Sequence, residues 1–135
     1  MIKKLSFIEV LEGIINLIEL KTGKRCYDDI PINANLPFYF AEIIGQEPDP
    51  SKTMWKEKYY VNIHAFSEGG SSIHIYNTIQ ELEEAMTESI TIKENYELIR
   101  QHPTGLQRIL TEEDNIKHAV LGYEFLIMYG YKTKL

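Results

Sequence analysis

The segment from Lys58 to Phe66, "KYYVNIHAF", constrains the fold of this chain more than any other stretch. Successive side chains of a β-strand point to opposite faces of a sheet, and this segment separates into two such sets. One set is Tyr59, Val61, Ile63 and Ala65, and the other is Tyr60, Asn62, His64 and Phe66. The alternation predicts a strand over 58–66.

A second strand is predicted just before it. The run "PFYFAEIIG" from Pro37 to Gly45 is aromatic and β-branched, which favours a strand that forms a hairpin with the first. Between them lies "QEPDPSKTMWK", in which Pro48 and Pro50 cannot donate to a ladder. We therefore expect residues 46–56 to form a long, exposed and mobile loop.

Two amphipathic helices are predicted. The first begins at a capping box of Ser6 and Glu9 and ends at Gly23. Its expected apolar stripe is Ile8, Leu11, Ile15 and Ile18. The second follows Gly69, Gly70, Ser71 and Ser72, with Ile75, Ile79, Leu82 and Met86 on its apolar face. Its solvated face carries Glu81, Glu83, Glu84 and Glu88.

The last third of the chain reads as three further strands, over 95–101, 106–112 and 116–131, with turn signals at 103–105 and 114–115. Together the elements predict an α+β fold in one domain spanning 1–135. Two helices would pack on a largely antiparallel or mixed sheet of about five strands. Most tyrosines and phenylalanines, among them Tyr59, Phe38 and Phe125, are expected to pack within this domain.

Composition excludes several functional classes. The net charge of −6 and the pI near 5.2 argue against nucleic-acid binding, which needs lysine and arginine to neutralise phosphates. Cys26 is the only cysteine, so no internal disulfide or thiolate zinc cluster can form, and a reducing compartment is expected. No apolar run approaches the roughly 20 residues of a membrane span, and acidic residues interrupt the N-terminal segment too often for a signal peptide. We expect a soluble cytosolic protein.

No catalytic, cofactor or metal site is predicted. Asp28 and Asp29 are adjacent carboxylates that could serve a metal or acid–base site, but His64, His74, His102 and His118 show no metal-ligand spacing. Gly69 and Gly70 lack the lysine of a P-loop. Nothing local activates Cys26. The rival interpretations are a small ligand-binding domain, with a pocket between helix and sheet lined by tyrosines and His64, and an adaptor or immunity protein with a basic partner.

The order of these features resembles the tail completion or tail terminator proteins of long-tailed bacteriophages and prophages. The features that carry the resemblance extend from about Phe7 to Tyr129. They are a leading helix, Tyr27, Asp28, Asp29 and Pro31 before a second proline-led strand at Pro37, Phe38 and Tyr39, and a closing D-x-x-x-H from Asp114 to His118. In such a protein, Cys26 and Tyr27 would end a short strand, and the two aspartates would lie in a turn.

The resemblance implies a structural virion protein without enzymatic activity. It implies a closed hexameric ring at the head-proximal end of the tail, with the tail tube protein and the head connector or stopper protein as partners. Such a protein is assembled in the host bacterial cytoplasm. The candidate interface residues are Trp55, Tyr27, Asp28, Asp29, Glu81, Glu84 and Glu88. The glutamates could also line a channel through which DNA passes, because an acidic wall does not hold phosphates.

Overall fold

The computed structural model describes residues 1–132. The elements in chain order are α1 (Phe7–Thr22), β1 (Cys26–Tyr27), β2 (Phe38–Pro48), β3 (Met54–Ser67), α2 (Ser72–Ala85), β4 (Glu97–Thr111), the 3₁₀ turn η1 (Glu113–Asn115) and β5 (Lys117–Tyr131). The five strands form one sheet in the order β1-β2-β3-β5-β4. β1 pairs parallel to β2, and the other neighbours pair antiparallel. The predicted α+β class with about five strands is confirmed.

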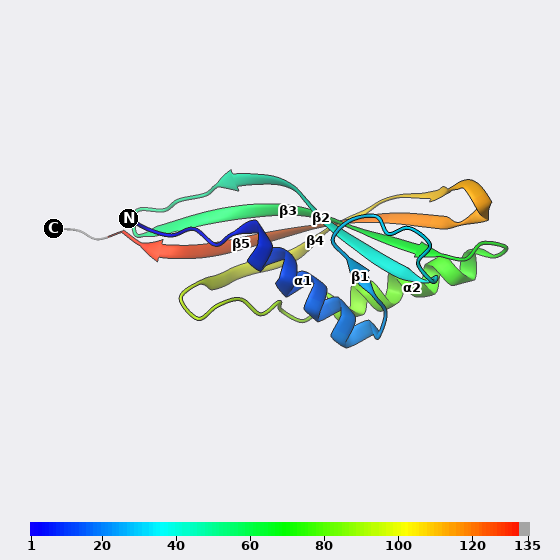
Figure 1. The fold of residues 1–135 in the computed structure, drawn as a ribbon. Coiled ribbons are helices and arrows are strands. Elements are labelled where there is room, and N and C mark those ends of the chain that lie inside the picture. The colour runs from blue at the N-terminus through cyan, green and yellow to red at the C-terminus, as the bar shows by residue number, and fades with distance from the viewer. Residues whose placement is uncertain (133–135) are drawn as a thin grey trace.

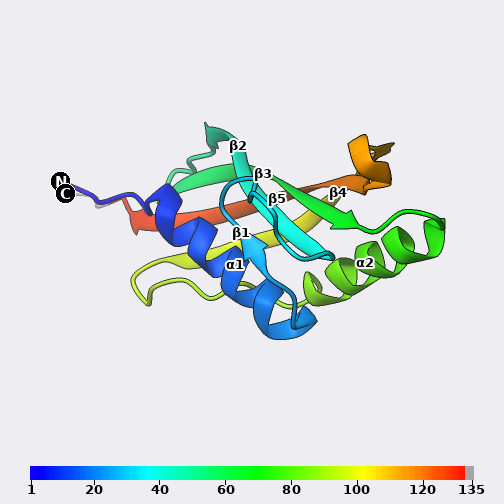
Figure 2. The same ribbon diagram turned by 45° about the vertical axis from the view of Figure 1, so that its right-hand side comes forward.

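Both helices lie on the same face of the sheet (Figure 1; Figure 2). The main core fills the space between them and the sheet, and it includes Val10, Ile14, Leu17 and Ile18 of α1 and Ile75, Ile79 and Leu82 of α2. The predicted alternation of β3 is confirmed, because Tyr59, Val61, Ile63 and Ala65 are all buried in this core. Two buried tyrosines of the sheet also form hydrogen bonds to the helical layer and to the segment before α1. The Tyr39 hydroxyl donates to the Thr78 carbonyl of α2 at 2.7 Å, and the Tyr59 hydroxyl donates to the Leu5 carbonyl at 2.9 Å.

The predicted helix ends are confirmed, and the predicted apolar stripe of α1 is confirmed in part, because Ile18 is buried and Leu11 and Ile15 pack against the core. Ser6 Oγ accepts a hydrogen bond from the Glu9 N–H, and Gly23 ends the helix with φ of 70°. The buried face, however, is centred on Val10, Ile14 and Leu17, and Ile8 is 68% exposed. Apolar side chains cover more than one sector of this helix, so periodicity alone could not select the sector that packs.

The predicted loop over 46–56 is confirmed only for residues 49–53, and its two ends belong to strands. β2 continues to Pro48, which pairs with Glu57, and β3 already begins at Met54. Asp49 N–H donates to the Lys56 carbonyl, so by the alternation of an antiparallel ladder the backbone of Pro48 points away from β3. A proline at such an edge position removes no ladder hydrogen bond. The strands therefore extend into most of the predicted loop.

The last third contains two long strands in place of the predicted three. β4 continues as one strand from Glu97 to Thr111 and passes through the expected turn at 103–105. Register shifts fall at Ile99, Thr104 and Gln107, so the turn residues occupy bulges. The second turn signal is confirmed, since Asp114 and Asn115 adopt positive φ in η1 between β4 and β5.

Candidate functional site

The outer edge of β2 is unpaired along most of its length. β1 contributes only two residues, which pair with Tyr39 and Phe40. Within residues 1–132, no strand pairs with the outer edge from Ala41 to Pro48. An exposed edge presents unpaired N–H and C=O groups, and it is a template for pairing with another chain.

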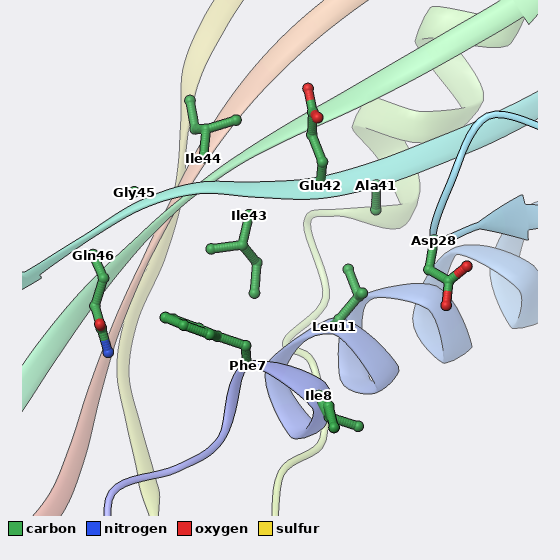
Figure 3. A pocket seen from close by; sticks show the side chains of 10 residues that line it. All are labelled: Phe7, Ile8, Leu11, Asp28, Ala41, Glu42, Ile43, Ile44, Gly45 and Gln46. Carbon is green, nitrogen blue, oxygen red and sulfur yellow. The ribbon is translucent and has the colours of Figure 1, made fainter.

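A groove of about 520 Å³ runs beside this edge. Phe7, Ile8 and Leu11 of α1 form one wall, and the stretch 41–46 of β2 forms the other. Figure 3 shows Ile43 and Phe7 pointing toward one another, with Leu11 between the helix and the strand. Asp28 lies at one end of the groove, beyond Ala41. The apolar sector of α1 that does not enter the core thus lines a concave surface along an open strand edge.

β4 forms the opposite edge of the sheet. It pairs only with β5, and most of its side chains are exposed. Ile99, Leu106 and Ile109 are large apolar side chains that remain exposed there. Two arginines, Arg100 and Arg108, lie on the same strand. Large exposed apolar side chains that follow a strand edge are typical of an interaction surface.

The sheet face opposite the helices carries a polar chain that connects three strands. Glu42 Oε1 on β2 lies 2.7 Å from Nε2 of His64 on β3, whose Nδ1 lies 2.7 Å from Nε2 of His118 on β5. His118 Nδ1 in turn lies 2.7 Å from Oε1 of Glu112, just after β4. Burial lowers the pKa of His118 from its usual value, although the Glu112 carboxylate opposes this by hydrogen bonding.

Aromatic rings surround this chain. Phe40 stacks on His64 with ring centroids 4.9 Å apart, and Phe66 stacks on His118 at 4.2 Å. Phe38, Phe40 and Phe66 form a second buried cluster. Among residues 1–132, no three metal-ligating side chains are placed to hold a metal ion. The arrangement links β2, β3 and β5 through hydrogen-bonded side chains on one face of the sheet.

Three candidate interface residues lie beside the β2 edge. Tyr27 pairs with Phe40 and packs edge-on against Phe38, while the Arg25 guanidinium lies 5.2 Å from its ring centroid. Asp28 and Asp29 follow in a bend, as expected, and Asp29 Oδ1 accepts a hydrogen bond from the Ile30 N–H. Of the three, the structure brings Asp28 into the groove.

The other candidates lie elsewhere. Trp55 is 37% exposed on β3, where it pairs with Gly130 and lies under the Lys132 ammonium, 4.4 Å from the ring centroid. It is nine residues along β3 from His64, a distance of about 30 Å. Glu81 of α2 pairs with Lys24, and Glu84 of α2 lies beside Lys21 in a pocket. Glu88, which was predicted on the solvated face of this helix, lies beyond its end at Ala85 and pairs with Lys21. A channel-lining role for these glutamates stays a prediction.

Two further expectations can be compared with the structure. A ligand pocket lined by tyrosines and His64 between helix and sheet is ruled out, because His64 lies on the face opposite the helices. Cys26 is buried, and burial together with the Glu19 carboxylate raises its pKa to about 12. Such a thiol stays protonated and is a poor nucleophile.

Comparison with known proteins identifies the family. The model of a protein family described as "Putative tail termination protein" matches residues 1–135, the whole chain. The chain belongs to the phage tail terminator family. The resemblance noted in the sequence is therefore confirmed, and this tail terminator family member is a structural protein of a phage tail.

A solved structure has a similar fold. A chain of the solved structure described as "Virion of native gene transfer agent (GTA) particle" superposes with a TM-score of 0.66, over 91% of this tail terminator family member and 99% of that chain. The two sequences are only 9% identical, so the likeness concerns the fold. Comparison with curated proteins gives no match. No helix within residues 1–132 is long and apolar enough to cross a membrane.

Sequence reasoning missed both the open β2 edge and the Glu42–His64–His118–Glu112 chain. The alternation of β3 placed His64 on the face opposite Tyr59, which was a partial signal. The partners of His64 come from strands 22 and 54 residues away, so only the sheet register brings them together. The edge depends on β1 being only two residues long, which no local pattern encodes.

Proposed function

We propose that this chain forms a closed hexameric ring at the head-proximal end of the tail. There it ends growth of the tail tube, and it provides the surface to which the head connector or stopper protein joins. The observation that carries this proposal is the match of the tail termination family over the whole chain.

The described sheet supports a ring. Its two outer edges differ in sequence and lie on opposite sides of the molecule, so a contact between the edges of successive copies would be head to tail. Head-to-tail contacts form a ring when the rotation between copies closes. The net charge of −6 also supports a place on the path of the genome, because the 20 acidic residues of each subunit outnumber its 14 lysines and arginines and a net acidic surface does not retain phosphates.

The proposal is tested by removing the gene from the phage or prophage that carries it and measuring tails by electron microscopy. We expect tubes of irregular, excessive length or tails of normal length without heads, depending on whether ending or joining is the essential step. Resupplying the chain in trans should restore joined particles of uniform tail length. Normal particles in the absence of the chain would refute the proposal.

A purified system separates the two steps. Tail tube protein that polymerises alone should stop elongating when the chain is added at a ratio near one ring per tube. An equal amount of heat-unfolded chain is the control. Continued elongation with the folded chain would exclude an ending role and leave joining to be measured by binding to the connector protein.

A further inference from the structure

We propose that the outer edge of β2 in one copy of this chain pairs with the segment Arg108–Thr111 of β4 in a neighbouring copy. The sheets of successive copies would then join edge to edge, with side chains of the added segment seated in the groove beside α1. This inference rests on the proposed ring and specifies the contact that builds it.

The backbone of β2 is arranged to accept another strand. Tyr39 N–H donates outward to the Arg25 carbonyl of the β1 segment at 2.9 Å, so by strand alternation the backbone groups of Ala41 and Ile43 also point outward. After the bulge at Ile44, Asp49 N–H points inward to Lys56, which turns the groups of Gln46 outward. β1 already pairs with the first part of the outer edge of β2, at Tyr39 and Phe40. A strand from another chain could pair with the rest of that edge.

The groove provides the side-chain part of the contact. When an extended segment adds to a sheet edge, main-chain hydrogen bonds supply affinity and pockets for alternate side chains supply specificity. The groove is lined by Phe7, Ile8, Leu11 and Ile43, of which Phe7 and Ile8 are more than half exposed. A segment with an exposed, branched apolar side chain fits such a lining, and Ile109 on β4 is one.

The bulges of β4 restrict which part of it can pair. Bulges at Ile99, Thr104 and Gln107 interrupt the strand, and bulged edges pair poorly with other chains. From Arg108 to Thr111 the register with β5 is unbroken. Those four residues are the stretch between the last bulge and η1, and within residues 1–132 no other strand covers their outer side.

Charge favours a second copy as the occupant. The β2 side of the contact carries Glu47 next to Gln46, whereas the β4 segment Arg108–Thr111 begins with an arginine and contains no acidic residue. Complementary charge steers association and disfavours wrong pairings such as β2 with β2. The two edges of one copy cannot meet each other, because β3 and β5 separate β2 from β4 by about 14 Å.

The first test removes one outward donor. Gln46→Pro takes away the outward N–H of residue 46 while leaving the ladder to β3 intact, by the same geometry that tolerates Pro48. Gln46→Ala is the matched control, because it removes the side chain and keeps the N–H. We expect Gln46→Pro to abolish ring assembly, measured by light-scattering mass of the isolated chain and by ring recovery on assembled tails, and Gln46→Ala to assemble. Assembly of a folded Gln46→Pro chain would overturn the proposal.

The second test does not depend on proline. Glu47→Arg and Arg108→Asp should each reduce assembly at least tenfold, and the double variant should recover most of it. Ile73→Lys, a charge placed at an exposed apolar residue of α2 outside both proposed contact segments, is the control and should assemble normally. Failure of either single variant to weaken assembly, or of the double variant to recover, counts against the β2–β4 contact.

The third test maps the contact in assembled tails. A chain with Gln46→Cys and Ile109→Cys, treated with a short bifunctional maleimide, should give a ladder of covalent oligomers, whereas each single variant should not. Hexamers that cap tubes but show no ladder would overturn this inference and leave the proposed function intact. A chain that neither forms rings nor alters tubes would refute the proposed function itself.

Discussion

The chain Glu42–His64–His118–Glu112 makes a prediction about acid stability. It contains three contacts of 2.7 Å, and each hydrogen bond needs one proton between its two atoms. A neutral His118 has one ring N–H and one free ring nitrogen, so it can donate at one of its two contacts and accept at the other. A protonated His118 carries an N–H on both ring nitrogens and can accept at neither.

The sign of the pH effect follows from His118. Burial lowers its pKa, the bond to Glu112 raises it, and charge on His64 and Arg108 lowers it, with a net downward direction. Because the folded chain resists protonation of His118 more than the unfolded chain does, this group's contribution is fully present above pH 6.5, and it is lost as the pH falls through the lowered value. Each unit by which the pKa of one group differs between the folded and unfolded chains is equivalent to about 1.4 kcal/mol. With an unfolded value near 6.5, one histidine can lower the free energy of unfolding by at most about 2 kcal/mol between pH 7 and pH 5, and we expect a fall within that limit.

Urea unfolding followed by far-ultraviolet circular dichroism at half-unit pH steps measures this loss. His118→Phe keeps a ring that can stack on Phe66 but carries no proton, so its stability should depend less on pH over the same range. His74→Gln, at a half-exposed histidine on α2, is the control and should retain the dependence of the unchanged chain. A His118→Phe curve parallel to that of the unchanged chain from pH 7 to pH 5 would refute the reasoning.

Three further predictions concern the core and its connections. Tyr39→Phe removes the hydroxyl that donates to the Thr78 carbonyl at 2.7 Å, and urea unfolding should show a loss of about 1–2 kcal/mol. Gly69→Ala would place a Cβ 1.9 Å from the Asn115 carbonyl oxygen, so the two turns must separate, and the melting temperature should fall by an amount equivalent to about 1–3 kcal/mol. Cys26, whose pKa burial raises to about 12, should react with iodoacetamide at pH 8 far more slowly in the folded chain than in urea, as measured by mass spectrometry; equal rates would contradict its burial.

The fold could be predicted from the sequence where one local pattern decided the outcome. The alternation around Val61 and Ile63 specified which face of β3 is buried, because a shift of one residue would expose every apolar side chain. Ser6 and Gly23 bounded α1, since each satisfies backbone groups that a helix end leaves unpaired. These signals act within a few residues and need no tertiary contact.

The remaining features depend on neighbours distant in sequence. Pro48 belongs to a strand because its missing N–H would have pointed away from β3, and the sequence does not reveal that direction. Pro103 and Gly105 remain in β4 because β5 pairs on both sides of the bulge between them. The groove exists because α1 packs through Val10 and Ile14, which leaves Ile8 beside β2. In each case the local sequence pattern allowed more than one structure, and contacts with residues distant in sequence selected one of them.

Both halves of the proposed contact are held in place before a neighbour arrives. At the end of β4, the lack of a side chain at Gly69 lets the turn before α2 contact Asn115. The hydrogen bond between Glu112 and His118 holds the residue that follows β4 against β5. At the groove, the capped start of α1 fixes Phe7, whose ring packs edge-on against Tyr59 with centroids 5.9 Å apart. Ordering a mobile segment on binding costs free energy that a preformed one does not lose. A contact of four paired residues can therefore contribute to a stable ring. The proposed hexamer contains six such contacts, and none of them requires a segment to fold on binding.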